Sequence, residues 1–317
     1  MNLHIHQKQF ADLLRLASQF LQIKQEFIEK DYWITLVLYQ LARSKYTHHV
    51  VFKGGTSLSK GYNLIDRFSE DIDLALLNQT WASSNQIKTI IRNIEKEISI
   101  DLNSIHVDGL TSKGSRFRKS VFEYTPIEKN NLNNTLILEI NSFANPIPYH
   151  RIGIQTLLCR FLINSGFEST IQQYNLQSFE INILALEQTL LEKLVALYRF
   201  SFYENTTERL SEKIRHFYDI YYLMQHELCI AFIQSPSFRD EFNLLLEHDK
   251  LVFDEPNGWS RMQFEDSPLT IDFDKVWKQL KRKYQTELTA LAYKPIPDEQ
   301  AVYRCVNQII IKLKAMC

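Results

Sequence analysis

Two aspartates, Asp71 and Asp73, stand two residues apart in the sequence D-I-D-L, and this spacing points to metal chemistry. Alternate side chains of a β-strand point to the same face, so a strand here would place both carboxylates on one face. Ile72 and Leu74 would then face the core. Two carboxylates on an open face suit Mg²⁺ or Mn²⁺, which take oxygen ligands and keep water or phosphate in the remaining positions.

A glycine motif, K-G-G-T-S-L-S-K at residues 53–60, precedes the aspartates and follows the apolar run of residues 50–52. The run predicts a buried strand that stops at the two glycines. Without side chains there, backbone N–H groups can approach phosphate oxygens, and a helix from about residue 57 favours the same negative charge. The predicted nucleotide-binding residues are Gly54, Gly55, Thr56, Ser57, Lys60 and Ser69.

Glu139 interrupts the apolar sequence L-I-L-E-I-N, which predicts a second strand. Burying an unpaired carboxylate is costly, so this side chain should face a partner, a metal or a cleft. As a third carboxylate beside Asp71 and Asp73, it would bind a second metal ion and help to deprotonate an attacking hydroxyl. The predicted metal ligands are thus Asp71, Asp73 and Glu139.

Each of these motifs has a simpler explanation when it is taken alone. Two aspartates in D-x-D are commonly a solvated pair, and two adjacent glycines are commonly a turn. Their combination in the expected strand and turn context favours a functional site. Motifs of other enzyme classes are absent from the sequence, including G-x-S-x-G, H-E-x-x-H and G-x-x-x-x-G-K-[ST].

The composition gives no argument for nucleic-acid or membrane binding, because 36 Lys and Arg residues balance 37 Asp and Glu residues. No apolar run reaches the length of a membrane span, and the first residues lack a secretory signal. The four cysteines lie far apart without a C-x-x-C pair, which argues against a zinc site or a disulfide framework. These features predict a cytoplasmic protein without a membrane partner.

Hydrophobic periodicity divides the chain into a mixed first half and a helical second half. Helices are predicted over residues 9–45 and 86–98, and strands over residues 71–76, 115–126 and 135–143. From residue 183 onward the pattern is helical, apart from an acidic segment at 254–274 that predicts a loop. We therefore predict an α+β fold, in which residues 1–160 form a mixed-sheet core with N-terminal helices and residues 161–317 form a mainly helical domain.

Two of the predicted helices carry polar residues whose spacing needs an explanation. Lys193 lies in a row of leucines, where it is either a functional cation or a lysine that extends along the helix edge to solvent. Asp219 shares a polar face with Arg215, so it belongs either to a site or to an ordinary i,i+4 ion pair. The residue pattern leaves both alternatives open.

Four stretches of the sequence together resemble a known toxin family. They are the glycine motif, R-x-S-x-D-I-D-L at residues 67–74, I-E-K-D-Y-W-I-T-L-V-L at residues 28–38, and the two helices around Lys193 and Asp219. The family is AbiEii/AbiGii, which includes the MenT toxins and belongs to the DNA polymerase β-type nucleotidyltransferase superfamily. Gly-Gly-Thr fifteen residues ahead of Asp71 is a longer gap than the superfamily usually has, and it resembles the toxin family more closely.

The resemblance covers about residues 25–225 and implies a nucleotidyltransferase-type mixed sheet. It also implies that Lys193 contacts the triphosphate, where an ammonium neutralises charge as the leaving group departs. Asp219 matches the final acidic motif of the family and would hold Lys193 in place or order the nucleotide. With Asp71, Asp73 and Glu139, these two residues make up the predicted catalytic set.

Charged residues elsewhere have less specific interpretations. Two alternatives stay open for a basic patch near residue 115: it meets the phosphate backbone of an acceptor, with Tyr124 stacking on a base, or it discourages aggregation at a sheet edge. Lys30 and Asp31 lie on a helix with scattered charges, which predicts a solvated face without chemistry. The basic patch consists of Lys113, Arg116, Arg118 and Lys119.

The function implied by the family is transfer of a nucleotide from an NTP, with Mg²⁺ or Mn²⁺ as the cofactor. A tRNA 3′ end is the expected acceptor, because related toxins look like tRNA 3′-end modifiers, and such transfer would block translation. The chain would be the toxin of a toxin–antitoxin pair, with its antitoxin encoded nearby. Two alternatives stay open: a GTP-binding toxin that acts by interaction, and transfer to a protein or a small molecule.

Overall fold

The computed structural model describes residues 1–69, 71–77, 83–127 and 134–315, which form two compact units. One unit comprises Met1–Asn63 and Phe68–Leu184. The other comprises Leu64–Arg67 and the described chain from Ala185 onward. The chain therefore enters the second unit briefly, at Leu64–Arg67, before it returns to the first.

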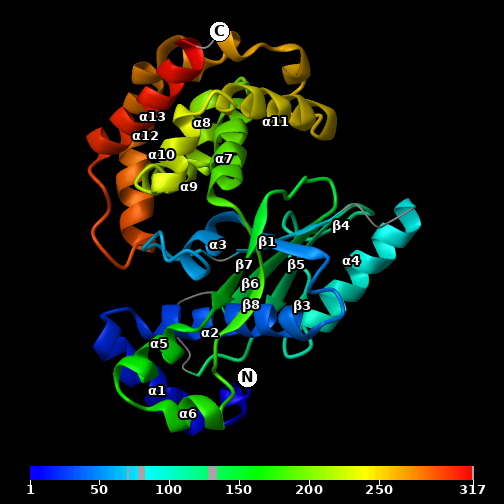
Figure 1. Cartoon of the computed structure of the whole chain (residues 1–317), viewed down its shortest axis with the longest axis vertical. Coiled ribbons are helices and arrows are strands. Elements are labelled where there is room, and N and C mark those ends of the chain that lie inside the picture. The colour runs from blue at the N-terminus through cyan, green and yellow to red at the C-terminus, as the bar shows by residue number, and fades with distance from the viewer. Residues whose placement is uncertain (70, 78–82, 128–133, 316–317) are drawn as a thin grey trace. The chain divides into compact units, whose positions relative to one another are not determined.

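The first unit is a mixed β-sheet with helices around it (Figure 1). Its strands are β1 (Val50–Lys53), β2 (Asp71–Leu76), β3 (Asn103–Ile105), β4 (Ser112–Lys113), β5 (Phe117–Glu123), β6 (Thr135–Asn141), β7 (Tyr149–Ile154) and β8 (Phe179–Leu184). Its helices are α1 (Gln7–Leu21), α2 (Gln25–Arg43), α3 (Gly54–Lys60), α4 (Ser84–Ile98), α5 (Leu157–Asn164) and α6 (Glu168–Gln173), and a 3-10 turn covers Leu3–Ile5.

The strand order is β3-β5-β6-β2-β1-β8-β7, with β4 pairing to β5 beside this path. β2 pairs with β6 and β1 pairs with β8 in parallel, whereas β1 pairs with β2 and β5 pairs with β6 in antiparallel orientation. The predicted strands at residues 71–76, 115–126 and 135–143 are confirmed as β2, β5 and β6. β7 has no counterpart in the prediction because most of its residues are exposed, so apolar alternation is missing from Y-H-R-I-G-I.

The first unit continues to Leu184, beyond the residue-160 boundary expected from the sequence. β8 is the cause, because it pairs with β1 in the middle of the sheet and with β7 at its edge. The segment between residues 161 and 184 therefore completes the sheet of the first unit.

Helix α2 is buried around most of its circumference. It packs against α1, α4, α5 and β8, and Figure 1 shows it alongside the sheet. Lys30 and Asp31 are 3% and 6% exposed, so the solvated face expected for this helix is wrong. Asp31 Oδ1 accepts a hydrogen bond from Lys60 Nζ at 2.6 Å, and Oδ2 accepts one from the Leu157 backbone N–H at 2.8 Å. The buried charge of Asp31 thus connects α2 to α3 and to the start of α5.

Asp31→Ala should destabilise the first unit, since it leaves the buried Lys60 ammonium without its carboxylate. Removing one partner of a buried ion pair costs about 3–5 kcal/mol, so the urea midpoint should fall clearly. Asp12→Ala is the matched control: it breaks an exposed pair with Arg15 and should change the free energy of unfolding by less than about 1 kcal/mol. Equal losses in the two variants would contradict a role for the buried pair.

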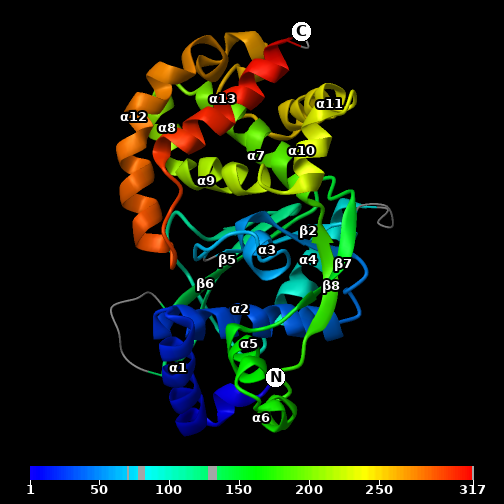
Figure 2. The ribbon, with the colours of Figure 1, turned by 60° about the vertical axis from the view of Figure 1, so that its left-hand side comes forward.

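The second unit is helical (Figure 2), and in it α7 packs against α8, α9, α10 and α11. Its helices are α7 (Leu186–Ser201), α8 (Thr206–Glu212), α9 (Ile214–Leu223), α10 (Glu227–Gln234), α11 (Phe238–Val252), α12 (Pro268–Leu291) and α13 (Glu299–Ala315). The loop expected at residues 254–274 is wrong in its last part, because α12 already begins at Pro268. Ser267 caps this helix by accepting from the Leu269 N–H, and proline is favoured in a first turn.

Candidate active site

Four charged residues are aligned across four neighbouring strands of the sheet. Asp73 of β2 is opposite Glu139 of β6, while Lys53 of β1 is opposite Asp73 and Lys119 of β5 is opposite Glu139. We call Lys53, Asp73, Glu139 and Lys119 the charged row. Residues in register point to the same face, and adjacent strands lie about 4.8 Å apart, so the carboxylates of Asp73 and Glu139 belong to neighbouring positions.

Asp71 lies on the same face as the charged row, two residues before Asp73. Asp71, Asp73 and Glu139 are partly exposed, whereas Ile72 and Leu74, which alternate with the aspartates, are fully buried. The structure therefore places the three predicted metal ligands on one face of two adjacent strands.

Lys119 forms an ion pair with the third carboxylate. Its Nζ lies 2.7 Å from Glu139 Oε1, and about a quarter of each side chain is exposed. Burial alone would lower the pKa of Lys119, but the hydrogen bond and charge of Glu139 and the charges of Asp71 and Asp73 raise it above its ordinary value. Lys119 therefore stays protonated in the combined field of the three carboxylates.

The basic patch does not form one surface. Arg118 alternates with Lys119 and points to the opposite face of β5, where it forms an ion pair with Glu95 of α4. Lys113 is exposed on β4, opposite Arg118. Neither a single phosphate-binding surface nor a single charged edge therefore describes the whole patch.

Gly54 allows the close approach between the glycine motif and Asp73. Its φ is +81°, in the left-handed region that favours glycine. A Cβ atom at this position would lie 2.0 Å from Asp73 Oδ2, so a side chain would collide with the carboxylate. α3 begins at this glycine, three residues earlier than residue 57, where the sequence pattern predicts a helix.

Gly55, Thr56 and Ser57 form the first turn of α3, and the two hydroxyl groups bond to backbone carbonyls. Thr56 Oγ1 donates to the Asp71 carbonyl at 2.5 Å, and Ser57 Oγ donates to the Gly54 carbonyl at 2.8 Å. Both side chains are buried. The Thr56 hydroxyl thus connects the glycine motif to the start of β2, while the Ser57 hydroxyl bonds within the motif.

The structure does not bring Lys60 to the charged row. Its ammonium donates to Asp31 and, at 2.8 Å, to the Gln155 carbonyl, and 7% of its side chain is exposed. Ser69 is buried, two residues before Asp71. The nucleotide-binding roles of Lys60 and Ser69 stay predictions.

Gly54→Ala should destabilise the first unit more than Gly109→Ala does. Both glycines have a positive φ, of +81° and +75°, so each substitution adds backbone strain of about 1 kcal/mol. A Cβ at Gly109 meets no atom of the described structure within 4 Å, whereas one at Gly54 meets Asp73. The difference between the urea midpoints of the two variants measures this collision, and equal midpoints would contradict it.

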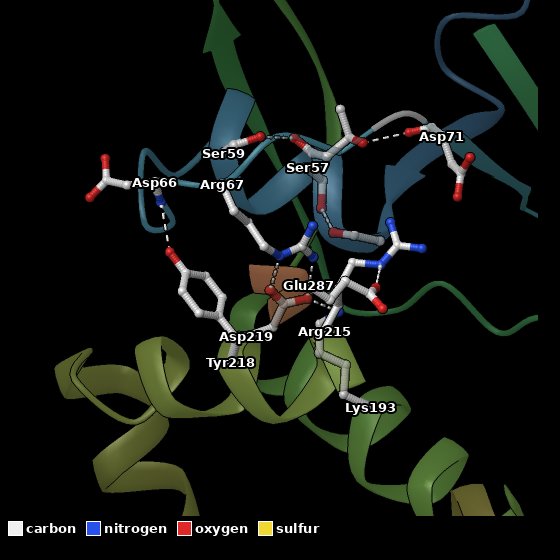
Figure 3. A network of polar contacts seen from close by, with 12 residues as sticks. Ser57, Ser59, Asp66, Arg67, Asp71, Lys193, Arg215, Tyr218, Asp219 and Glu287 are labelled. Atoms are coloured by element: carbon white, nitrogen blue, oxygen red, sulfur yellow. Dashed lines mark hydrogen bonds and ion pairs between the residues drawn. The ribbon is translucent and has the colours of Figure 1, made fainter. Parts of the chain in front are cut away.

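A second group of predicted residues lies in the helical unit. Arg67 donates from Nε to Asp219 Oδ1 at 2.8 Å and from Nη2 to Oδ2 at 2.7 Å (Figure 3). Lys193 Nζ donates to Asp219 Oδ2 at 2.7 Å. We call these three residues the Asp219 cluster; Asp219, Arg67 and Lys193 are 0%, 3% and 5% exposed. Lys193 therefore does not extend to solvent along the helix edge.

The i,i+4 ion pair considered for Arg215 and Asp219 is not formed. Arg215 Nε lies 3.6 Å from Glu287 Oε1 of α12. Figure 3 draws both side chains. Asp219 contacts Lys193 instead. Such a contact is what the predicted role of holding Lys193 in place requires.

The segment Leu64–Arg67 is anchored to the helical unit by its backbone as well as by Arg67. The Tyr293 N–H donates to the Asp66 carbonyl at 3.0 Å, and the Asp66 N–H donates to Tyr218 Oη at 3.3 Å (Figure 3). Lys294 Nζ lies 2.9 Å from Asp66 Oδ1. Arg67 was absent from the predicted site, and its place at the head of R-x-S-x-D-I-D-L is the one signal in the sequence that could have indicated it.

The electrostatics of the Asp219 cluster favour an anion. Burial would raise the pKa of Asp219, but the charges and hydrogen bonds of Arg67 and Lys193 hold it well below its ordinary value. Two cations thus share one ionised carboxylate, and the cluster keeps a net positive charge. Burial, followed by the charges of Lys193 and Lys213, lowers the pKa of His216 well below its ordinary value, so its ring is neutral.

Asp219→Asn should lower stability at neutral pH and remove part of its acid dependence. An unfolded aspartate has a pKa of about 4, whereas the folded protein keeps Asp219 ionised to lower pH. Below pH 4 the unfolded state therefore binds the extra proton, and the stability that Asp219 contributes above this pH is lost as the pH falls.

The measurement is the free energy of urea unfolding of wild type and variant from pH 7 to pH 3. Their difference should be largest at pH 7 and should shrink as the pH falls below 4, with a slope that approaches about 1.4 kcal/mol per pH unit. Asp108→Asn, at a fully exposed side chain, is the control and should show no such trend. A difference that does not depend on pH would contradict the assigned role of Asp219.

The face that bears Asp71 and Asp73 offers oxygen ligands of the kind that Mg²⁺ and Mn²⁺ take. Within the described parts of the chain, no three His, Cys, Asp or Glu side chains are grouped so that they could hold a metal ion as they stand. The described partner of Glu139 is Lys119. The two aspartates therefore fit a divalent cation by ligand type and position, while the ammonium of Lys119 engages the third carboxylate.

Comparison with known proteins finds a matching family model and a solved structure of similar fold. Residues 36–304 match the family model described as nucleotidyl transferase AbiEii toxin, type IV TA system. Among solved structures, the chain is similar to MenT4, a nucleotidyltransferase toxin from Mycobacterium tuberculosis H37Rv, with 16% sequence identity and a TM-score of 0.51 over 96% of this chain and 98% of that chain. At this identity the similarity concerns the fold. No curated protein matches the chain.

The match to the family model spans most of the sequence, so the chain belongs to the AbiEii nucleotidyltransferase toxins of type IV toxin–antitoxin systems. The predicted family and the predicted α+β fold are thereby confirmed. The match continues to residue 304, well past residue 225, where the resemblance of motifs ends. Among the helices of the described chain, none combines the length and apolarity that crossing a membrane requires.

Proposed function

We propose that this toxin transfers a nucleotide from an NTP to the 3′ end of a tRNA, with Mg²⁺ or Mn²⁺ as its cofactor. The observation that carries the proposal is the alignment of Asp73 with Glu139, with Asp71 on the same face. Gly54 brings backbone without a side chain against this group of carboxylates. Carboxylates beside accessible backbone N–H groups suit a metal-bound triphosphate.

Asp71, Asp73 and Glu139 are the proposed ligands of the cation. When bound, the cation would neutralise charge on the triphosphate and acidify the acceptor hydroxyl. Among the predicted nucleotide-binding residues, Gly54 and Gly55 would contact phosphate through their backbone N–H groups. The hydroxyl groups of Thr56 and Ser57 bond to carbonyls, so these residues would contribute through backbone position.

The proposed reaction forms a bond from the acceptor hydroxyl oxygen to the α-phosphorus of the NTP. The bond from this phosphorus to the oxygen that bridges to the β-phosphorus breaks, and pyrophosphate leaves. Glu139 is the proposed acceptor of the hydroxyl proton. Lys193 is proposed to neutralise the charge that develops on pyrophosphate. The net positive charge of the Asp219 cluster supports this role, and Asp219 would orient the ammonium of Lys193.

Family membership implies a cognate antitoxin as the partner of this toxin. We propose that the toxin acts in the cytoplasm, where tRNA and NTP are present, without a membrane partner. Transfer to the 3′ end would prevent aminoacylation and stop growth.

Asp73→Ala should abolish transfer, because it removes a carboxylate from the proposed metal site. The test incubates the protein with Mg²⁺, total tRNA and each NTP labelled at the α-phosphate, and separates the products on a gel. Wild type should label tRNA from the α-phosphate but not from the γ-phosphate, and Asp73→Ala should lower the rate by about 100-fold or more. Asp274→Ala, at an exposed aspartate of α12, should retain the wild-type rate.

Wild type and Asp274→Ala should inhibit growth to the same extent, whereas Asp73→Ala should not inhibit growth. Label in a protein fraction instead of tRNA would show that the acceptor is a protein and would overturn the proposed tRNA acceptor. Absence of label from every fraction, together with full toxicity of Asp73→Ala, would overturn nucleotidyl transfer in favour of a toxin that acts by binding.

A further inference from the structure

Lys119 belongs to the charged row and contacts a proposed metal ligand, Glu139. We propose that Lys119 is an internal counter-ion of the site, and that its ammonium competes with a divalent cation for the carboxylate of Glu139. This inference rests on the proposed function, because it concerns the same carboxylates. It assigns Lys119 as a positioning residue that acts through Glu139.

The backbone fixes Lys119 beside Glu139. β5 pairs with β6 over seven consecutive residues, and in this register Lys119 is opposite Glu139. On its other side β5 pairs with β3 and β4, so it is an internal strand of the sheet. The ion pair is therefore a result of the strand register, and Lys119 can release Glu139 through rotation of its side chain alone.

Repulsion among the carboxylates gives the ammonium its role. Asp71, Asp73 and Glu139 lie on one face of adjacent strands, where their negative charges repel one another. A positive charge 2.7 Å from Glu139 Oε1 reduces this repulsion in the protein without a cation.

The same geometry opposes binding of a second positive charge to Glu139. A divalent cation on this carboxylate would lie close to the ammonium, and two cations at short distance repel. Binding therefore requires that Lys119 turns away from Glu139 or that Glu139 turns away from Lys119. Either movement costs the 2.7 Å hydrogen bond, so the ammonium lowers the affinity of the site for the cation.

An edge-protecting role does not account for Lys119, because β5 has strands on both sides. A role as one of several phosphate-binding residues of a basic patch does not account for it either, because Arg118 points to the other face. Competition for Glu139 uses the contact that the structure shows.

The test measures binding of Mn²⁺ to the full chain by electron paramagnetic resonance, without nucleotide or acceptor. Lys119→Met removes the charge and should tighten Mn²⁺ binding about fivefold. Lys119→Arg keeps the charge and should bind Mn²⁺ within about twofold of wild type. Lys113→Met is the matched control, because it removes the same charge from the exposed strand β4, and it should change affinity less than about twofold.

A second comparison separates competition at Glu139 from a general effect of charge. In Glu139→Gln a neutral amide replaces the carboxylate, so adding Lys119→Met should no longer tighten Mn²⁺ binding. If Lys119→Met does not fold, Lys119→Gln replaces it with the same expectation, since the amide keeps a hydrogen-bond donor for Glu139.

The outcomes distinguish this inference from the proposed function. Unchanged or weaker Mn²⁺ binding in Lys119→Met overturns the inference alone, as does an equal gain in the Glu139→Gln background. Absence of Mn²⁺ binding in wild type and in every variant overturns the metal site of the proposed function as well.

Discussion

The buried carboxylate of Asp219 must stay ionised for the Asp219 cluster to keep its form. Removing water from an ionised carboxylate costs several kcal/mol unless opposite charges and hydrogen bonds replace the water. Arg67 supplies two such bonds in a planar fork and Lys193 supplies a third. The segment that contains Arg67 ends four residues before Asp71. One electrostatic requirement thus fixes both a proposed phosphate-binding lysine and the end of the segment Leu64–Arg67 within the helical unit.

The faces of the acidic strands were predictable because strand periodicity is local. In β2 each aspartate is followed by an apolar residue that is fully buried, and this alternation predicts which side chains share a face. The neighbours across strands were not predictable in the same way. That Glu139 lies between Asp73 and Lys119 follows from strand order and register, which depend on the packing of the whole sheet. The sequence therefore indicates the carboxylates but not the lysine partner of Glu139.

Helical spacing likewise indicates that Lys193 and Asp219 need polar partners, but it does not say which ones. Arg67 is 152 residues away from Asp219 in the sequence, and no local pattern links the two. The expectation that the charged residues of α2 lie on a solvated face was wrong for the same reason. Periodicity describes one helix at a time, whereas Asp31 is buried because α3 and α5 supply its donors. Long-range ion pairs are thus the part of this structure that the sequence pattern cannot provide.

The excursion of Leu64–Arg67 also bears on how such a protein can evolve. The chain passes between the two compact units after Asn63, after Arg67 and after Leu184, so neither unit is encoded by one continuous stretch. A gene fragment that starts at residue 185 would encode Asp219 without the guanidinium that provides two of its hydrogen bonds. Exchange of the stretch from residue 185 onward by recombination would therefore separate Asp219 from Arg67 and remove one of the two cations that hold this buried carboxylate.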